Sequence, residues 1–313
     1  MSKAGRVRVY KVSNPALPKR SFILSIPWAQ RIIYDPSICG LKLEDLAKKC
    51  SEEFLRVAWE LVPLFRRLRN FQIAELVVLR GSLGYHFDQA YRAVFGRYLP
   101  RCFVGAKRYR ISGGEFGANI FYTNFDSLPS RGLLFTGDTI ATGVSLSQTL
   151  AVTRSELRNR DYDISALLVF TIAGSFRGCS RLLEWEERYR EWWPNFRVYL
   201  FACEALFGLA PNGTDLLFAH PEAILPAETK QRVIRKYGDL DSGYLPSRIC
   251  AIFDWGDRNF KPDRHLEDLI KFCREHLRRT REPQARRVLQ KLVSKAKTEL
   301  KNIRGRNQLY KPK

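Results

Sequence analysis

The sequence predicts an α/β fold in which a twisted parallel sheet is flanked by helices. Apolar segments of about 4 to 8 residues alternate with amphipathic helical segments, which is typical of a parallel sheet covered on both faces. The chain has 313 residues, of which 45% are hydrophobic. This length and composition allow a substantial core, in one large domain with an appendage or in two modest domains.

The predicted elements follow in chain order. Apolar residues at helical spacing predict one or two helices over residues 41–69, before the core. Apolar runs predict core strands at residues 74–79, 101–106, 132–136, 164–173 and 196–203. Helices are expected at residues 88–95, 146–159 and 180–192.

The last hundred residues break this alternation. Pro and Gly punctuate residues 211–245, which predicts an irregular subdomain or lid around a short helix. Two basic amphipathic helices separated at Pro283 should follow, because residues 264–313 hold 16 Lys and Arg against five Asp and Glu. We therefore expect an N-terminal segment with helices (1–70), a core (71–260) and a helical extension (261–313).

Composition limits the possible functions. The formal net charge is +21, so nucleic acid, phosphorylated metabolites or an anionic membrane surface could be attracted. The seven scattered Cys residues and four His residues form no metal-ligand pattern, and the odd Cys count argues against a disulfide framework. No apolar run is long enough for a signal peptide or membrane span, so we expect a soluble cytoplasmic protein.

Residues 132–150, GLLFTGDTIATGVSLSQTL, resemble an anion-binding turn. A buried strand ends where α/β folds place ligands, and a helix N-terminus with unpaired N–H groups follows. Thr142, Gly143 and Ser145 could bind phosphate, while Asp138 suits sugar hydroxyls. The alternative is that Asp, Thr and Ser only cap the next helix.

The segment GDTIATGVS, residues 137–145, is similar to the phosphoribosyl-diphosphate (PRPP) motif of type I phosphoribosyltransferases. The resemblance implies that Asp138 holds the ribose hydroxyls. It assigns the 5′-phosphate to the loop residues Thr139, Ala141, Thr142, Gly143, Val144 and Ser145.

A second motif agrees in place and type. VVLRGSLGYHF, residues 77–87, resembles the diphosphate-binding segment of the uracil phosphoribosyltransferase branch. The resemblance implies that Arg80, Gly81 and Ser82 bind diphosphate, for which the Arg fork is well shaped. The alternative for Arg80 is a surface ion pair.

A third similarity lies far downstream. FDWGDRNF, residues 253–260, and GYLP, residues 243–246, resemble that branch's hood, the subdomain that covers the base. The resemblance implies hood roles for Tyr244, Leu245, Asp254, Trp255, Gly256 and Asp257.

Residues 104–129 stand where the family has a flexible catalytic loop. The resemblance offers Lys107, Arg108 and Arg110 to the leaving diphosphate, with Gly113, Gly114 and Gly117 giving the hinge freedom of a closing lid. The alternative is an exposed hairpin with a basic edge.

Together these similarities imply an enzyme that transfers ribose 5-phosphate from PRPP to a uracil-like base with release of diphosphate. Asp138, Arg80, Arg108 and Arg110 would carry catalysis in a homodimer. Mg²⁺ would enter with PRPP, with Asp138 as the one protein group near it, and we expect no metal site built from protein ligands alone. The alternative is a non-catalytic sensor of PRPP or nucleotides whose basic tail binds RNA or DNA; the tail's simpler interpretation is a solvated face packed on the core.

Two departures from the family pattern bear on activity. Gly137 stands where the uracil branch has its acid, so ribose binding should be weakened or rearranged. Phe253 and Trp255 replace small hood residues, which should alter the base pocket.

Overall fold

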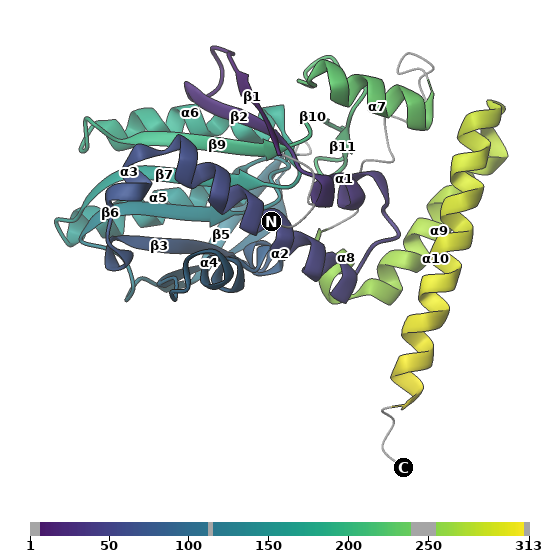
Figure 1. Cartoon of the computed structure of the whole chain (residues 1–313), viewed down its shortest axis with the longest axis horizontal. Helices are drawn as coiled ribbons and strands as arrows, with labels where there is room; N and C mark the ends of the chain where they lie inside the picture. The colour runs from purple at the N-terminus through teal and green to yellow at the C-terminus, as the bar shows by residue number, and fades with distance from the viewer. Residues whose placement is uncertain (1–6, 112–114, 239–254, 310–313) are drawn as a thin grey trace.

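An eight-stranded sheet forms the centre of the protein (Figure 1). The computed structural model describes residues 7–111, 115–238 and 255–309. The strand order is β1-β2-β9-β7-β6-β3-β4-β5, in which the inner six strands run parallel and the edge strands β1 and β5 pair antiparallel. The predicted α/β class with a mostly parallel sheet is confirmed.

The predicted core strands are present with small shifts at their ends. They are β3 (Ile73–Leu79), β4 (Arg101–Arg110), β6 (Arg131–Gly137), β7 (Asp163–Thr171) and β9 (Arg197–Cys203). Strands β1 (Arg8–Val12) and β2 (Arg20–Ser25) were not predicted. Because β2 pairs in parallel with β9, the central sheet also includes residues from the N-terminal segment.

Helices cover both faces of the sheet because neighbouring strand residues point to opposite sides. Leu133 and Phe135 of β6 pack with α2 (Leu41–Leu61), α3 (Pro63–Arg67) and α4 (Phe87–Phe95). Leu134 packs on the other side with α5 (Val144–Asn159) and α6 (Phe176–Arg190). Helix α6 begins four residues earlier than predicted, since the Ser175 hydroxyl accepts a hydrogen bond from the Gly178 N–H and caps it.

Most of residues 104–129 form the hairpin that was the alternative to a flexible loop. Strand β5 (Phe116–Asn124) pairs antiparallel with β4, from Phe103 opposite Asn124 to Arg110 opposite Phe116. The segment is thus a hairpin that widens the sheet, because ladder hydrogen bonds satisfy its backbone. Its tip, with Gly113 and Gly114, lies outside the described residues.

A second, small sheet combines a strand that precedes β9 with two strands that follow it, and a helix comes after them in the chain. Strands β8 (Gly174–Ser175), β10 (Leu206–Leu209) and β11 (Leu216–Leu217) form the small sheet, and α7 (Ala227–Tyr237) is the predicted short helix. The remainder of the expected hood, including Tyr244, Leu245 and Asp254, lies outside the described residues. Helix α1 (Pro27–Tyr34) lies beneath α7, where Tyr237 donates a hydrogen bond to the Tyr34 carbonyl.

The C-terminal extension is a helical hairpin of α9 (Pro262–Arg279) and α10 (Pro283–Leu309), broken at Pro283 as predicted. Its apolar residues join the core cluster on the α2 face, among them Leu266, Leu269 and Leu289. Helix α8 (Trp255–Phe260) leads into it and is anchored by buried Arg258, which donates to the carbonyls of Ile32, Asp35 and Ile38. The apolar side of the extension therefore packs on the core while its polar side faces solvent.

Candidate functional site

A cavity of about 610 Å³ opens at the carboxyl edge of the sheet, where β3 and β6 end side by side. The chain continues from β3 to β4 on one side and from β6 to β7 on the other, so the strand order reverses between them. Crevices at such switch points are the usual ligand sites of open α/β sheets. The cavity is lined by three segments far apart in sequence, residues 78–81, 138–146 and 255–256, and by side chains of the β4–β5 hairpin.

The turn after β3 brings Arg80 and Gly81 to the cavity. The Arg80 guanidinium carbon lies 5.7 Å from the centre of the Phe260 ring, over its face. A Cβ atom on Gly81 would lie 2.4 Å from Oδ1 of Asp138, so only glycine lets this carboxylate approach the turn. Ser82 does not line the cavity; its buried hydroxyl instead accepts the Val78 N–H at 2.9 Å and stabilises the turn.

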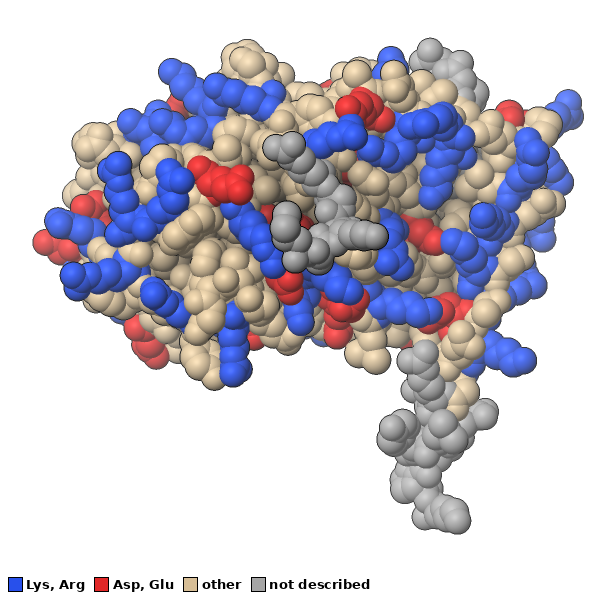
Figure 2. Space-filling model, in the orientation of Figure 1, with Lys and Arg blue, Asp and Glu red and all other residues tan. Residues whose placement is uncertain are grey.

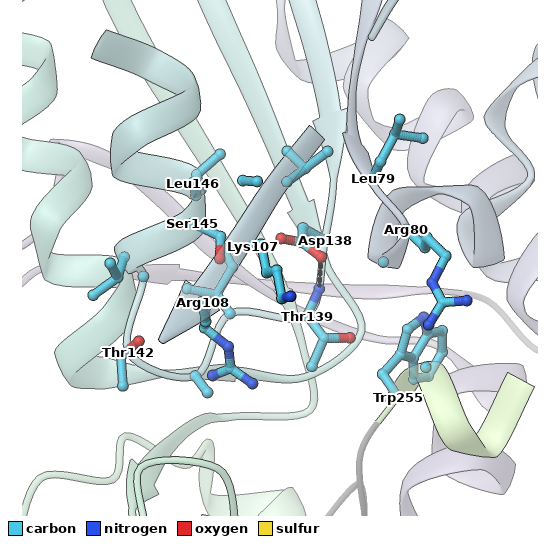
Figure 3. A pocket seen from close by; sticks show the side chains of 18 of the residues that line it. Leu79, Arg80, Lys107, Arg108, Asp138, Thr139, Thr142, Ser145, Leu146 and Trp255 are labelled. Atoms are coloured by element: carbon cyan, nitrogen blue, oxygen red, sulfur yellow. Dashed lines mark hydrogen bonds between the residues drawn. The ribbon is translucent and has the colours of Figure 1, made fainter. Parts of the chain in front are cut away.

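Asp138 is the one acid among the described lining residues. Its Oδ1 accepts the Thr139 N–H at 2.9 Å (Figure 3). Burial raises the pKa of Asp138 to about 7, although the Thr139 hydrogen bond and the charge of Arg108 act in the opposite direction. The carboxylate is therefore poorly solvated and has no ion pair within the described part of the chain. It can accept further hydrogen bonds from a ligand in the cavity.

Gly137 is explained by two aromatic rings that the sequence did not single out. A Cβ atom at this position would lie 2.4 Å from Cε2 of Phe87 and 2.9 Å from Cδ1 of Tyr85. Buried Tyr85 also accepts the Ile172 N–H at 3.1 Å and lies 3.3 Å from the Thr139 hydroxyl. The space that a first acid would occupy is therefore filled by Tyr85 and Phe87.

The loop after Asp138 wraps closely against the start of α6. Gly143, at φ +74°, has no room for a side chain, since a Cβ atom would lie 2.6 Å from the Gly178 carbonyl oxygen. The Ser175 hydroxyl donates to the Ala141 carbonyl and fixes the loop from below. These contacts hold residues 139–143 in a tight curve over the cavity.

Helix α5 starts at the cavity without a side-chain cap. Gly143 is its N-cap residue, and no side chain of the described residues caps its first N–H groups, so the interpretation of Asp, Thr and Ser as helix caps is wrong. The buried Thr142 hydroxyl has no partner among the described residues. Unpaired amides and hydroxyls at a helix N-terminus are the groups that bind phosphate.

The β4 strand supplies a basic wall. Lys107 and Arg108 line the cavity, and Figure 3 shows both near Asp138 and Thr139. Arg110 does not line it; its guanidinium lies over the Phe116 ring at 5.6 Å. Phe121 and Thr214, which the sequence did not indicate, complete this side.

Helix α8 closes the opposite side with Trp255 and Gly256. Trp255 is only 5% exposed, and its ring centre lies 5.4 Å from that of Tyr85. Asp257 does not line the cavity and instead makes ion pairs with Lys261 and Arg264. The indole thus serves as a wall supported by the Tyr85 ring.

The site combines three cations, one carboxylate and an uncapped helix end. This combination suits an anionic ligand with phosphate groups at two positions and hydroxyls between them. Among the described residues, no group of three or more His, Cys, Asp or Glu could hold a metal ion. In the same part of the chain, no helix is long and apolar enough to cross a bilayer.

Comparisons with known proteins give only distant similarities. No protein family profile matches the sequence, and no curated protein matches it. The structure is similar to adenine phosphoribosyltransferase from Trypanosoma brucei, determined with AMP, pyrophosphate and ribose-5-phosphate, with 11% identity and a TM-score of 0.38, over 63% of this chain and 87% of that one. It is also similar to a hypoxanthine phosphoribosyltransferase from Staphylococcus aureus, with 15% identity and a TM-score of 0.27, over 41% and 62% of the two chains.

Proposed function

We propose that the protein is a phosphoribosyltransferase that uses PRPP as donor and a nitrogen base as acceptor. One observation carries the proposal: Arg80–Gly81, Asp138–Ser145 and Trp255–Gly256, the segments singled out by their motifs, line a single cavity at the switch point of the sheet. Segments separated by more than 50 residues meet there in an order that suits diphosphate, ribose and 5′-phosphate.

Each segment has a distinct part in binding. The 5′-phosphate would lie against the uncapped N-terminus of α5 and the hydroxyls of Thr142 and Ser145. Asp138 would accept hydrogen bonds from the ribose hydroxyls, and Arg80 with Lys107 would bind the diphosphate. The base would lie toward Trp255, and uracil is the first candidate because the Arg80 and Trp255 segments resemble that branch.

The reaction breaks the bond between C1 of ribose and the diphosphate oxygen and forms a bond from C1 to the base nitrogen. Positive charge develops on the ribose in the transition state, as in glycoside transfer. The Asp138 carboxylate would stabilise this charge, while Arg80, Lys107 and Arg108 would stabilise the departing diphosphate. The main contribution of the site is to hold both reactants in line.

Mg²⁺ fits this site as a companion of the substrate. Asp138 offers one carboxylate, and Mg²⁺ is commonly bound through one or two carboxylates together with substrate phosphates. When bound, the ion would neutralise charge on the diphosphate.

The test is release of diphosphate from PRPP and Mg²⁺ in the presence of each base of a panel led by uracil. We expect turnover with one base, and its loss in Asp138→Asn. Tight PRPP binding without turnover on any base would contradict the transferase and support the second candidate, a sensor of PRPP. Tyr85 and Phe87 favour that candidate, because they exclude a second acid from the ribose site. Absence of PRPP binding would contradict both.

A further inference from the structure

Helices α7 and α10 lie side by side (Figure 1), and no described residue of either lines the cavity. Gln284 at the start of α10 donates a hydrogen bond to the Arg235 carbonyl of α7 at 3.3 Å. Lys and Arg side chains gather on the right of the face drawn in Figure 2, where Figure 1 places these helices. The cations that define this α7–α10 basic face are the exposed Arg235, Arg287, Lys291 and Lys295, together with Lys236, whose ammonium is partly buried.

The three cations of α10 follow a regular spacing. Arg287, Lys291 and Lys295 are four residues apart, so successive side chains are about 6 Å apart along the helix axis. The buried stripe of α10, which includes Leu289 and Ala296, packs on α9 and the core. The cations thus form a row that the packing of the helix leaves in solvent.

Few acids of the described residues offset this charge. Arg235, Arg287 and Lys291 make no ion pair within the described residues, whereas Lys295 pairs with Asp35. Lys236 donates to the Tyr34 carbonyl, and burial followed by the charges of Lys295 and Lys291 lowers its pKa, against the influence of Asp35. Lysines from helices more than 50 residues apart in sequence therefore lie close enough to repel one another.

The neighbouring side chains indicate the kind of polyanion. Ile234 is the one large apolar side chain that is well exposed on the described parts of α7, α9 and α10, and no aromatic ring is. A membrane surface would need apolar anchors, and single-stranded nucleic acid would be expected to stack its bases on aromatic rings. A double helix needs only cations along its phosphate backbone.

We infer that the α7–α10 basic face binds the phosphate backbone of double-helical nucleic acid without reading its sequence. Helix α10, with 27 residues, is about 40 Å long and could follow roughly one turn of a duplex. This inference does not depend on the activity of the cavity.

The test measures binding of the full-length protein to a fluorescent 20-base-pair duplex between about 50 and 200 mM salt. The variant Arg235→Gln/Arg287→Gln/Lys291→Gln removes three exposed cations that make no ion pair in the described structure. The control, Arg66→Gln/Arg67→Gln/Arg97→Gln, removes three exposed cations from α3 and from the chain just after α4, and changes net charge equally. Thermal unfolding of both verifies that each remains folded.

We expect the first variant to bind at least about 10-fold more weakly at low salt, with its log–log salt slope reduced by about 3. The control should change neither quantity appreciably. Equal losses in the two variants, or no duplex binding by the wild type at 50 mM salt, would overturn the inference. Preference for a single strand of the same sequence, or for vesicles rich in anionic lipid, would overturn it as well.

Discussion

Two carboxylates in the sheet share a raised pKa but differ in their surroundings. Burial raises the pKa of Glu75, within β3, to about 7, and that of Asp138, at the end of β6, to about 7. Glu75 is fully buried and has Arg101 Nε at 2.8 Å, whereas Asp138 faces the cavity without an ion pair among the described residues. A perturbed pKa therefore does not identify a functional acid; the missing partner beside a cavity does.

The largest expected effect comes from removing each charge in turn. Asp138→Asn should lower the rate of diphosphate release about 100-fold or more, because the positive charge that develops on the ribose is no longer stabilised by the Asp138 carboxylate. Glu75→Gln makes the same chemical change at the other acid and should lower the rate less than about 3-fold. Steady-state kinetics of diphosphate release compare the two variants. Equal losses of rate would contradict the distinction between a functional acid at Asp138 and a structural one at Glu75.

Two glycines beside Asp138 sharpen the distinction between packing and binding. Gly137→Ala places a methyl group against Tyr85 and Phe87, and should destabilise the fold by about 1–3 kcal/mol. Gly81→Ala places its methyl group against the Asp138 carboxylate, and should weaken PRPP binding more than it lowers stability. Denaturant unfolding and calorimetric titration of both variants measure this, and the reverse pattern would show that the two positions are wrongly assigned.

A chain of hydrogen bonds runs from the Ile172 N–H through the Tyr85 hydroxyl to the Thr139 hydroxyl, next to Asp138. Because Tyr85 accepts the Ile172 N–H, its own proton is free for the Thr139 oxygen at 3.3 Å. The Thr139 proton is then available to an acceptor in the cavity. We therefore expect the Thr139 hydroxyl to donate a hydrogen bond to the ligand, while the neighbouring Asp138 carboxylate accepts hydrogen bonds from the ligand.

Tyr85→Phe and Thr139→Val should each weaken PRPP binding by about 5- to 10-fold, and the double variant should be no weaker than either single one. Such non-additivity is expected when two residues act as one unit. Thr139→Ser, which keeps the hydroxyl, should bind as the wild type does. Additive losses would mean that the two hydroxyls act separately.

A smaller effect concerns stability and pH. Since the folded pKa of each acid lies above its unfolded value, the folded state holds protons more tightly, and stability falls as pH rises from about 4 to about 7. Asp138→Asn should flatten this fall and stabilise the protein at pH 8 by on the order of 1 kcal/mol. Urea unfolding at a series of pH values measures it; a steeper fall in the variant would contradict the assigned direction.

The sequence predicted the parts of the fold that rest on buried apolar runs, such as β3, β6 and β7. It missed β2 because a six-residue strand near the N-terminus is stabilised by β9, a partner about 180 residues away. It offered the β4–β5 hairpin only as the alternative to a flexible loop, because a single side chain of β5 is buried and the strand shows no core pattern. Both strands depend on tertiary pairing, which local pattern does not contain.

For the site, the convergence of Arg80 and Asp138 followed from their place after neighbouring parallel strands. The role of Ser82 could not be predicted in this way, because it depends on a hydrogen bond with the Val78 N–H. The position of Arg110 could not be predicted either, because it depends on contact with the Phe116 ring. The reason for glycine at position 137 could not be predicted either, because the Tyr85 and Phe87 rings that exclude a side chain there come from residues that follow β3. Whether Tyr244, Leu245 and Asp254 form a hood remains a prediction from the sequence.

Asp138 is proposed to bind the ribose hydroxyls of PRPP in the cavity, and this role can be measured directly. Calorimetric titration of PRPP and Mg²⁺ at pH 7, in buffers of different ionisation enthalpy, measures both affinity and proton release. We predict one site per chain, and release of about half a proton more from the wild type than from Asp138→Asn, because ligand contact lowers a pKa near 7. Equal affinity and equal proton release in the two proteins would contradict the claim.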